Sequence, residues 1–195
     1  MLVLVRHGET QANAEQRLLG RAESPLTGRG LAQAKAIGRL LAPVSRLVSS
    51  PLWRARQTAE ALGLGLEVEV DERWVEVDYG MYDGQPLGEV PAEVWQRWRN
   101  DAEYQPPGGE SLVEMGTRVR AACEELFAEH GSARSEADVV VVSHVSPIKA
   151  AVAWALGTDD ALAWRLYLAT GSMTVIAWGA DTPVLRGYNL TPAAF

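Results

Sequence analysis

The sequence is poor in cysteine, lysine and histidine, with one, two and three of them among 195 residues. A single cysteine, Cys123, cannot form an internal disulfide, and we expect a protein of a reducing compartment such as the cytoplasm. Three histidines, without clustered carboxylates at ligand spacing, make no convincing metal site. The sequence therefore predicts neither a disulfide framework nor a metal or other cofactor.

Long hydrophobic runs are also missing. Apolar stretches such as Val139–Val142 are only a few residues long, whereas a membrane-spanning helix needs roughly 20 residues. The first residues lack the charged region and the long apolar stretch of a secretory signal. We therefore expect no signal peptide and no association with a membrane.

Positive charge is scarce overall. The formal net charge is −7, which argues against nucleic acid as a partner, because phosphate backbones are held chiefly by basic surfaces. Lys35 and Lys149 are the only lysines, so arginine supplies nearly all cationic side chains. Guanidinium groups bind phosphate oxygens in a fork that lysine cannot reproduce, although a biased genome composition is the simpler explanation of the count as a whole. An anionic ligand would have to bind at a local positive cluster.

The apolar patterns predict one domain, residues 1–195, in which strands and helices alternate. Hydrophobic residues make up 47% of the chain, which is enough for a full core. The alternation is typical of a three-layer α/β/α sandwich with a mostly parallel mixed sheet. Strands are expected at 2–5, 46–50, 66–70 (half-exposed, at the sheet edge), 138–142, 172–178 and 184–188, and helices at 28–42, 51–63, 111–129 and 145–156; the last two strands join around Asp181.

Two stretches have no clear periodicity. Residues 13–23 are predicted to be irregular. Residues 77–109, with many glycines and prolines, predict a lid-like insert that includes a short helix with Trp95 and Trp98. We expect the two tryptophans to anchor this insert on the core, with direct substrate contact as the alternative.

Two fully apolar strands end in histidine. Leu2–Val5 is followed by Arg6-His7-Gly8, and the strand at 138–142 is followed by Ser143-His144. Strands without a polar face are typical of the centre of a parallel sheet. Open α/β sheets bind their ligands at the carboxyl ends of such strands, where a glycine lets the backbone turn sharply. The pattern therefore indicates a ligand site at this edge of the sheet.

Further motifs follow in order along most of the chain. They are Arg6-His7-Gly8-Glu9-Thr10 with Asn13, Leu26-Thr27, Ser49-Ser50-Pro51-Leu52 with Arg54, Glu76 with Asp78-Tyr79-Gly80, Gly108-Gly109-Glu110-Ser111, and Ser143-His144. The ordered set resembles the histidine phosphatase superfamily, the phosphoglycerate-mutase-like proteins. The resemblance implies that family's fold, in which the two histidine-terminated strands are neighbours and place His7 beside His144.

Phosphoryl transfer needs a nucleophile, a cationic cradle for the oxygens, and an acid for the leaving alcohol. The resemblance implies that His7 is the nucleophile and forms a transient phosphohistidine. Its attacking nitrogen must be unprotonated, so we expect the other nitrogen to donate to an acceptor such as a backbone carbonyl. The resemblance further implies a phosphate pocket, with the residues Arg6, Asn13, Gly20, Arg54 and His144.

Glu76 stands where the family has its proton donor. Among the carboxylates nearby in sequence, Glu69 and Glu72 are competitors and Asp78 is the most serious one. A carboxyl group must stay protonated near neutral pH to act as a general acid. Glu110 is interpreted as a helix-start residue stabilised by the helix dipole, with a supporting role in the site left open.

The chain departs from the family pattern after the second histidine. Many members have glycine there, whereas this chain has Val145. A valine restricts the backbone, so we expect a different outer wall of the pocket. The segment Val145-Ser146-Pro147-Ile148-Lys149 is similar to a branch that includes proteins assigned as α-ribazole phosphatases.

The resemblance as a whole implies the phosphatase branch, that is, a metal-independent phosphomonoesterase that acts on a small phosphorylated metabolite through a phosphohistidine. A phosphoglycerate mutase dependent on 2,3-bisphosphoglycerate is the alternative, and a non-catalytic phosphate- or phosphoprotein-binding module is a third. The compact segment between Glu76 and His144 lacks the longer, lysine- and arginine-bearing insert of those mutases, which favours the phosphatase. The natural substrate stays open, and so does a homodimer.

Overall fold

The computed structural model describes residues 1–130, 137–179 and 182–192. The elements are β1 (Leu2–Arg6), α1 (Gln11–Ala14), α2 (Gly28–Gly38), β2 (Val44–Ser49), α3 (Trp53–Ala61), β3 (Val68–Val70), η1 (Glu72–Trp74), η2 (Gly80–Tyr82), α4 (Ala92–Asn100), α5 (Leu112–His130), β4 (Asp138–Ser143), α6 (Val145–Leu156), η3 (Asp160–Arg165), β5 (Met173–Ala177) and β6 (Val184–Leu190). The predicted order of strands and helices is confirmed. The short helix α1 reaches into the stretch predicted to be irregular, and Asp181, in the predicted connection, lies outside the described residues.

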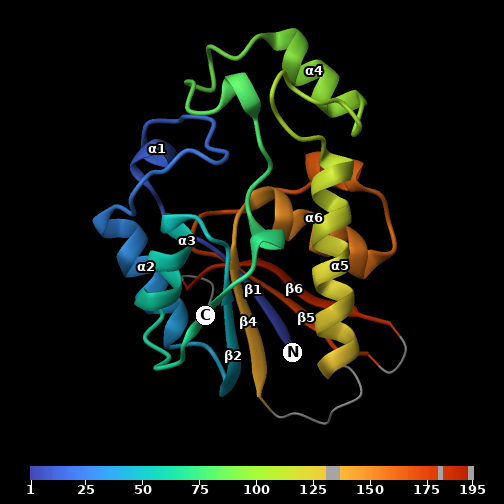
Figure 1. Cartoon of the computed structure of the whole chain (residues 1–195). Helices are drawn as coiled ribbons and strands as arrows, with labels where there is room; N and C mark the ends of the chain where they lie inside the picture. The colour runs from blue at the N-terminus through green and yellow to red at the C-terminus, as the bar shows by residue number, and fades with distance from the viewer. Residues whose placement is uncertain (131–136, 180–181, 193–195) are drawn as a thin grey trace.

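The six strands of the described residues form one mixed sheet in the order β3-β2-β4-β1-β5-β6 (Figure 1). β1 pairs in parallel with β4, and β2 pairs in parallel with both β4 and β3. β5 runs antiparallel to its neighbours β1 and β6. β1 and β4 are therefore adjacent central strands, as the resemblance implied.

Two layers of helices cover the sheet, and the side chains of β1 alternate between them. Leu2 and Leu4 pack in the core shared with α5 and α6, while Val3 and Val5 pack in the core shared with α2 and α3. Figure 1 shows these helix pairs on opposite sides of the sheet. The three-layer α/β/α sandwich is thus confirmed. Strands covered on both faces need no polar side, which explains the continuous apolar runs in the sequence.

Cys123 belongs to the core beneath α5. It is fully buried among apolar side chains. Burial raises the pKa of its thiol far above the usual range, which removes the thiolate form that would react. Cys123 is therefore an inert core residue.

The loop after β1 packs directly on the start of α2. A Cβ atom at Gly8 would overlap the carbonyl of Gly30, and one at Gly30 would overlap the backbone of Glu9. Thr27 caps α2, because its side chain accepts a hydrogen bond from the N–H of Gly30 at 3.1 Å. Only glycine allows this contact of backbone with backbone. The contact fixes the loop that carries His7.

The insert of residues 77–109 crosses the carboxyl ends of the strands, where α4 lies above the sheet in Figure 1. Trp98 is almost fully buried against Val94 of the insert and Leu18 outside it, in a cluster separate from the two cores of the sheet, so it anchors the insert on the segment around Leu18. Trp95 is only half-buried and meets Trp164 of η3 edge-on, with ring centroids 6.4 Å apart. The two tryptophans of α4 therefore have different surroundings, and only Trp98 belongs to the buried cluster that anchors the insert.

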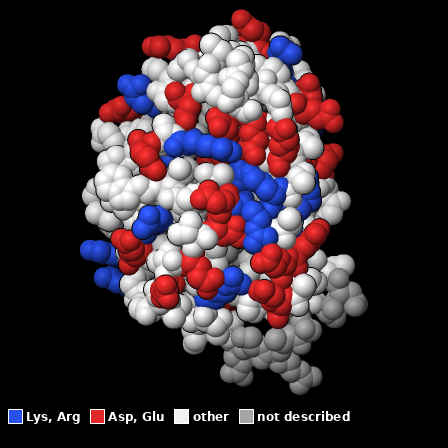
Figure 2. All heavy atoms as spheres, viewed as in Figure 1, with Lys and Arg blue, Asp and Glu red and all other residues white. Residues whose placement is uncertain are grey.

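Acidic and basic side chains are interspersed over the face shown in Figure 2. Among the described residues, several arginines pair with at least one carboxylate, namely Arg21, Arg46, Arg73 and Arg118. Such pairs neutralise charge locally and contribute little to stability when exposed. In the same part of the chain, none of the helices has the length and apolar character needed to cross a membrane.

Candidate active site

The pairing of β1 with β4 brings two histidines together. Arg6 is paired with Ser143 at the end of the two strands, and the N–H of His7 donates to the carbonyl of Ser143 at 3.0 Å. The rings of His7 and His144 follow side by side, with centroids 5.1 Å apart and planes tilted by 58°. Both side chains are buried. The structure thus places the two predicted histidines as the resemblance implied.

His7 is held in the form that a nucleophile needs. Its Nδ1 lies 2.8 Å from the carbonyl oxygen of Gly8, and because a carbonyl can only accept, Nδ1 has the proton and Nε2 keeps its lone pair. Gly8 is fixed in turn, since its N–H donates to Thr58 Oγ1 at 3.1 Å. Burial, reinforced by the charges of Arg54 and Arg6, holds the pKa of His7 well below 6.5. The ring is therefore neutral at neutral pH.

His144 is neutral in the opposite tautomer. Arg54 Nε can only donate and lies 3.2 Å from Nδ1 of His144, so this nitrogen accepts. The proton is then on Nε2, which donates to Ser50 Oγ at 2.7 Å. Burial and, after it, the charge of Arg54 hold the pKa of His144 well below 6.5. Both ring nitrogens of His144 are therefore engaged with neighbouring side chains in this structure.

Two arginines lie beside the histidines without a carboxylate in ion-pair contact in the described part of the chain. The fully buried Arg54 donates to the carbonyls of Gly20 at 2.5 Å and Ala22 at 2.9 Å. Arg6 donates to the carbonyl of Leu168 at 2.6 Å. Burial lowers the pKa of Arg6 to about 10 and lowers that of Arg54. Desolvated cations without a paired carboxylate are costly, so the site favours an anionic ligand.

Glu76 approaches from the loop between η1 and η2, and 3% of its surface is exposed. Its Oε1 accepts from the N–H groups of Val77 at 2.8 Å and Ser146 at 3.2 Å, and its Oε2 accepts from the N–H of Val145 at 3.1 Å. The last two residues open helix α6, whose N-terminus favours negative charge. Three backbone donors therefore fix the direction of this carboxyl group.

The carboxylates that compete with Glu76 in the sequence have other surroundings. Asp78 lies 3.5 Å from Arg21, Glu69 forms an ion pair at the surface, and Glu72 is exposed. Of the four, Glu76 is the one that lines the cavity in front of the histidines. The geometry therefore favours Glu76 as the proton donor.

Arg118 of α5 supports the loop that carries Glu76. Its guanidinium donates to the carbonyls of Arg73 at 2.7 Å, Val75 at 2.8 Å and Glu76 at 3.3 Å. It also pairs with Glu110 through two contacts of 2.9 Å. No sequence pattern indicated this role, because it depends on the fold bringing α5 against a loop more than 40 residues earlier.

Glu110 lies directly before the capping residue of α5 and takes no part in the cap itself. Helix α5 is capped by Ser111, whose Oγ accepts from the N–H of Glu114 at 3.1 Å, while the Glu114 carboxylate accepts from the N–H of Ser111 at 3.0 Å. Glu110 instead pairs with Arg118 and, at 3.3 Å, with Arg21. Through Arg118, Glu110 thus supports the loop that carries Glu76; the sequence had left such a supporting role open.

A cavity of about 250 Å³, here named the phosphate cavity, opens in front of His7. Arg6, Asn13 and Glu76 line it as well. The Oδ1 of Asn13 accepts from the N–H of Thr10 at 3.2 Å, so the amide nitrogen is the group available to donate to a ligand. The cavity thus has a nucleophile, a cation and an acid on its wall.

The other predicted phosphate-binding residues lie behind this wall. Arg54 and His144 contact each other and are fully buried. Gly20 uses its carbonyl for Arg54 and its N–H for Asp83, at 2.7 Å. The contacts of Gly20 in this structure therefore orient Arg54 rather than meet a ligand. Val145 does line the cavity, in line with the outer wall expected from the departure after the second histidine.

Sequence reasoning missed three residues near the site. Leu18 and Tyr79 line the phosphate cavity from segments without periodic pattern; Tyr79 belongs to the motif Asp78-Tyr79-Gly80, which was the available signal for it, whereas no pattern marked Leu18. Lys149 lies in a neighbouring cavity, one helical turn after Val145. That spacing of four residues on a helix was the available signal.

No group of three or more His, Cys, Asp or Glu within residues 1–130, 137–179 and 182–192 is arranged to hold a metal ion. The third histidine, His130, stacks on Trp178 with centroids 6.0 Å apart. The positive charge around the phosphate cavity is supplied by arginine side chains of this chain.

Comparison with known proteins places this arrangement in a family. Residues 2–191 match the family model described as the histidine phosphatase superfamily (branch 1). The solved structure of a mycobacterial glucosyl-3-phosphoglycerate phosphatase in complex with VO3 superposes with a TM-score of 0.87 and 33% identity, over 97% of this chain and 98% of that one.

Two curated relatives with other names are also similar to this chain. A probable phosphoglycerate mutase of Salmonella choleraesuis is 35% identical over 199 residues, which cover 97% of this chain and 90% of that protein. A bifunctional protein of Mycobacterium tuberculosis is 36% identical over 188 residues, covering 92% of this chain and 50% of that protein. The chain thus spans about half the length of the first curated relatives that it matches.

Proposed function

The chain belongs to the histidine phosphatase superfamily, and on that basis we propose that it is a metal-independent phosphomonoesterase acting on a small phosphorylated metabolite. The observation that carries the proposal is the tautomer of His7. Its Nδ1–H donates to Gly8 O at 2.8 Å, which directs the Nε2 lone pair to the reaction. Solved and curated relatives named as phosphatases support the same activity.

In the first step, Nε2 of His7 attacks the phosphorus while the bond from phosphorus to the leaving oxygen breaks. Glu76, in its protonated form, gives its proton to that oxygen, so the alcohol leaves neutral. Arg6 on the wall of the phosphate cavity stabilises the phosphoryl oxygens, whose charge shifts during the transfer, and the positive charge of Arg54 behind that wall adds to this stabilisation. The products of this step are the alcohol and a phosphohistidine.

In the second step, water attacks the phosphohistidine. The carboxylate of Glu76 takes a proton from that water, and the bond between phosphorus and Nε2 breaks. Phosphate leaves, and His7 returns to the neutral tautomer held by Gly8. Glu76 thus acts as acid and then as base, as microscopic reversibility requires for a single group on one side of the phosphorus.

A phosphoglycerate mutase is the second candidate, since a relative of similar identity has that name. A mutase must keep water from its phosphohistidine while the intermediate reorients. From Val77 to Gly109 this chain offers only Arg97 and Arg99 as cations, and Arg97 lies over the ring of Tyr104 at 4.4 Å. Extra positive groups for a carboxylate are thus scarce, which favours hydrolysis.

A non-catalytic phosphate-binding module is the third candidate. Pure binding needs the cations but no proton donor. Here the carboxyl group of Glu76 is held by three N–H donors and lines the phosphate cavity. A carboxylate in that place would weaken the binding of an anion, so the arrangement supports catalysis.

The test measures phosphate release and interconversion of 3- and 2-phosphoglycerate side by side, with and without 2,3-bisphosphoglycerate, and repeats the release assay after exhaustive chelation. We expect hydrolysis of aryl and alkyl phosphates to exceed isomerisation greatly and to survive chelation. Isomerisation that outpaces phosphate release would establish the mutase. Absence of all turnover would leave the binding module, and loss on chelation that one divalent ion restores would contradict metal independence.

A further inference from the structure

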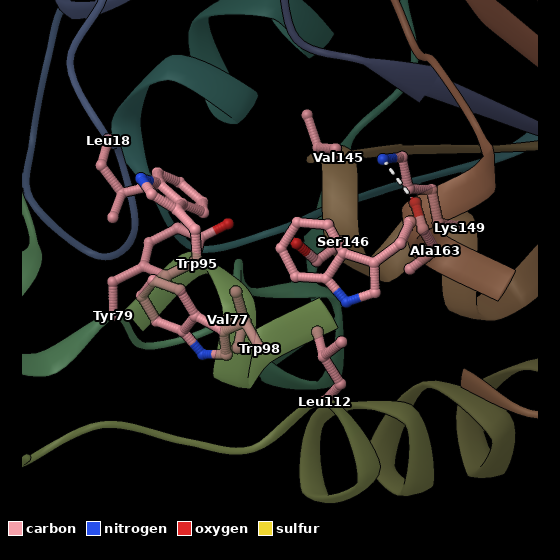
Figure 3. Close-up of a pocket in the computed structure, with 11 residues that line it drawn as sticks. Leu18, Val77, Tyr79, Trp95, Trp98, Leu112, Val145, Ser146, Lys149 and Ala163 are labelled. Carbon is pink, nitrogen blue, oxygen red and sulfur yellow. Dashed lines mark hydrogen bonds between the residues drawn. The ribbon is translucent and has the colours of Figure 1, made fainter. Parts of the chain in front are cut away.

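A second cavity of about 180 Å³ adjoins the phosphate cavity (Figure 3). We name it the ring cavity. Leu18, Tyr79 and Val145 line both cavities, so the two cavities meet at these three side chains. A substrate that extends from the phosphate cavity past these side chains enters the ring cavity.

The proton donor lies at the junction of the two cavities. The carboxyl group of Glu76 lines the phosphate cavity, while the N–H groups that bind it belong to Val145 and Ser146, which line the ring cavity. The oxygen that Glu76 protonates belongs to the leaving alcohol. The body of that alcohol is therefore directed into the ring cavity.

The walls of the ring cavity are rich in aromatic side chains. Figure 3 shows Trp95, Trp98 and Tyr79 grouped on one side of it. Trp95 lies 5.4 Å from Trp98 and 6.4 Å from Trp164, measured between ring centroids. Aromatic rings attract other flat rings through offset and edge-on contacts, and tryptophan loses little conformational freedom when a ligand binds. This wall is suited to a flat, apolar group.

The volume of the ring cavity limits the size of that group. An engineered apolar cavity of about 150 Å³ in another protein holds one benzene molecule. The ring cavity has about 180 Å³, so a single ring fills it.

The wall of the ring cavity includes one cationic side chain. Lys149 is the only charged side chain on its wall in the described part of the chain, and its Nζ donates to the carbonyl of Ala163 at 2.9 Å, as Figure 3 shows. An ammonium group has three donors, so Lys149 can also donate to an acceptor on the ligand. Burial lowers the pKa of Lys149. In such a poorly solvated place, a hydrogen bond from the charged ammonium group is stronger than in water.

We propose that the natural substrate is the phosphomonoester of an alcohol that has one flat apolar ring and a hydrogen-bond acceptor within reach of Lys149. This rests on the proposed phosphatase function. The ring occupies the cavity formed by α4, η3 and α6, and the phosphoryl group faces His7.

The first test compares benzyl phosphate with ethyl phosphate in the full chain. Both release a primary alcohol and depend on Glu76, so the ratio of their kcat/KM values reports on the ring. Burial of a phenyl group predicts a ratio of about 10- to 100-fold in favour of benzyl phosphate. A ratio near one, with both esters hydrolysed, overturns the inference and leaves the phosphatase proposal intact.

The second test removes aromatic side chains from the wall of the ring cavity. Trp95→Ala and Trp164→Ala are each expected to lower the benzyl-to-ethyl ratio at least about fivefold, since each removes one aromatic contact. Trp53→Ala is the matched control, because that side chain is half exposed on α3 and lines neither cavity. Trp164 is 37% exposed, so its variant carries the test if Trp95→Ala does not fold. An unchanged ratio in the folded variants overturns the inference.

The third test concerns the acceptor. The 4-carboxy derivative of benzyl phosphate is expected to lose about tenfold in kcat/KM in Lys149→Met, whereas benzyl phosphate itself changes less, because methionine keeps the apolar stem of lysine. Equal losses for the two esters refute the role of Lys149. If neither these esters nor 4-nitrophenyl phosphate is turned over by the wild type, the proposed function fails and this inference fails with it.

Discussion

His7 and His144 receive different roles from their immediate neighbours. A carbonyl beside His7 fixes the proton on Nδ1, and a guanidinium beside His144 fixes the proton on Nε2. The first arrangement leaves a lone pair for attack, and the second uses both ring nitrogens to link Arg54 to Ser50. The sequence places both histidines after apolar strands and the expected role of His7 predicted its tautomer, whereas only the structure shows the opposite tautomer of His144.

Glu76→Gln tests the assignment of the acid. We expect turnover of ethyl phosphate to fall by about 10²- to 10⁴-fold, because general acid catalysis contributes that much when the leaving group is poor. Formation of the phosphoenzyme from 4-nitrophenyl phosphate should change far less, because nitrophenolate leaves without a proton. Rapid-quench measurement of the released alcohol separates this step from the later attack of water.

Asp78→Asn is the matched control, since Asp78 precedes η2 and its Oδ1 accepts from the N–H of Gly80 at 2.8 Å. We expect it to affect the two esters equally. If Asp78→Asn shows the dependence on the leaving group and Glu76→Gln does not, the acid has been assigned to the wrong residue.

Among the helices and strands, the sequence predicts best those whose apolar residues recur with a clear period. β1 and β4 are uninterrupted runs of apolar residues, and the stripe of α5 includes Met115, Val119 and Leu126, all buried. The helix α1 has no such stripe. It is held by a capping box between Thr10 and Asn13 within four residues, too short a segment for any period to appear.

For the residues of the site, too, prediction depends on whether a local sequence pattern marks them. Strand ends place His7 and His144, and their adjacency was predicted only because the resemblance implied that the two strands are neighbours. Glu76 and Arg118 meet only because α5 packs against a loop, and the walls of the ring cavity come from α4, α6 and η3. Contacts between elements that are distant in sequence leave no local pattern, which is why Arg118 was not predicted.

Arg118→Gln tests whether α5 positions the loop of the acid. The variant loses the hydrogen bonds to three loop carbonyls and the pair with Glu110. We expect the kcat for ethyl phosphate to fall about tenfold and that for 4-nitrophenyl phosphate to fall less, because the effect acts through Glu76. Loss of such a half-buried pair should also lower the free energy of unfolding by about 1–3 kcal/mol.

Arg120→Gln provides the control from the same helix. Arg120 pairs with Asp160 at 2.8 Å, and that pair has no contact with the loop of Glu76 among the described residues. We expect a comparable loss of stability without dependence of the rate on the leaving group. Equal effects of both variants on the two esters would show that Arg118 is merely structural.

At the scale of the whole molecule, the two buried, neutral imidazoles lower the stability of the folded state in acid. Burial is the main cause that holds the pKa values of His7 and His144 well below 6.5 in the folded chain. The unfolded chain has ordinary histidines, with a pKa near 6.5. Below that pH the unfolded state therefore binds more protons than the folded state, and acid favours unfolding.

We expect the free energy of unfolding to be constant with respect to these two groups above about pH 7.5. It should fall as the pH drops below about 6.5, with a limiting slope of about 1.4 kcal/mol per pH unit for each histidine. Urea titrations between pH 8 and pH 5.5, in buffers free of phosphate, measure this slope. His7→Gln removes one of the two groups and should reduce it, while a slope that is flat in the wild type would contradict the neutral buried pair.

The phosphohistidine itself is the central claim, and Glu76→Gln offers the best chance to trap it. With a ³²P-labelled 4-nitrophenyl phosphate, this variant should form the intermediate without an acid and then hydrolyse it slowly, because the base for water is missing. Rapid alkaline quench followed by peptide mapping should find close to one acid-labile phosphate per chain, on Nε2 of His7, and none in the His7→Ala, Glu76→Gln double variant. Continued release of phosphate with no label on His7 would contradict the covalent mechanism.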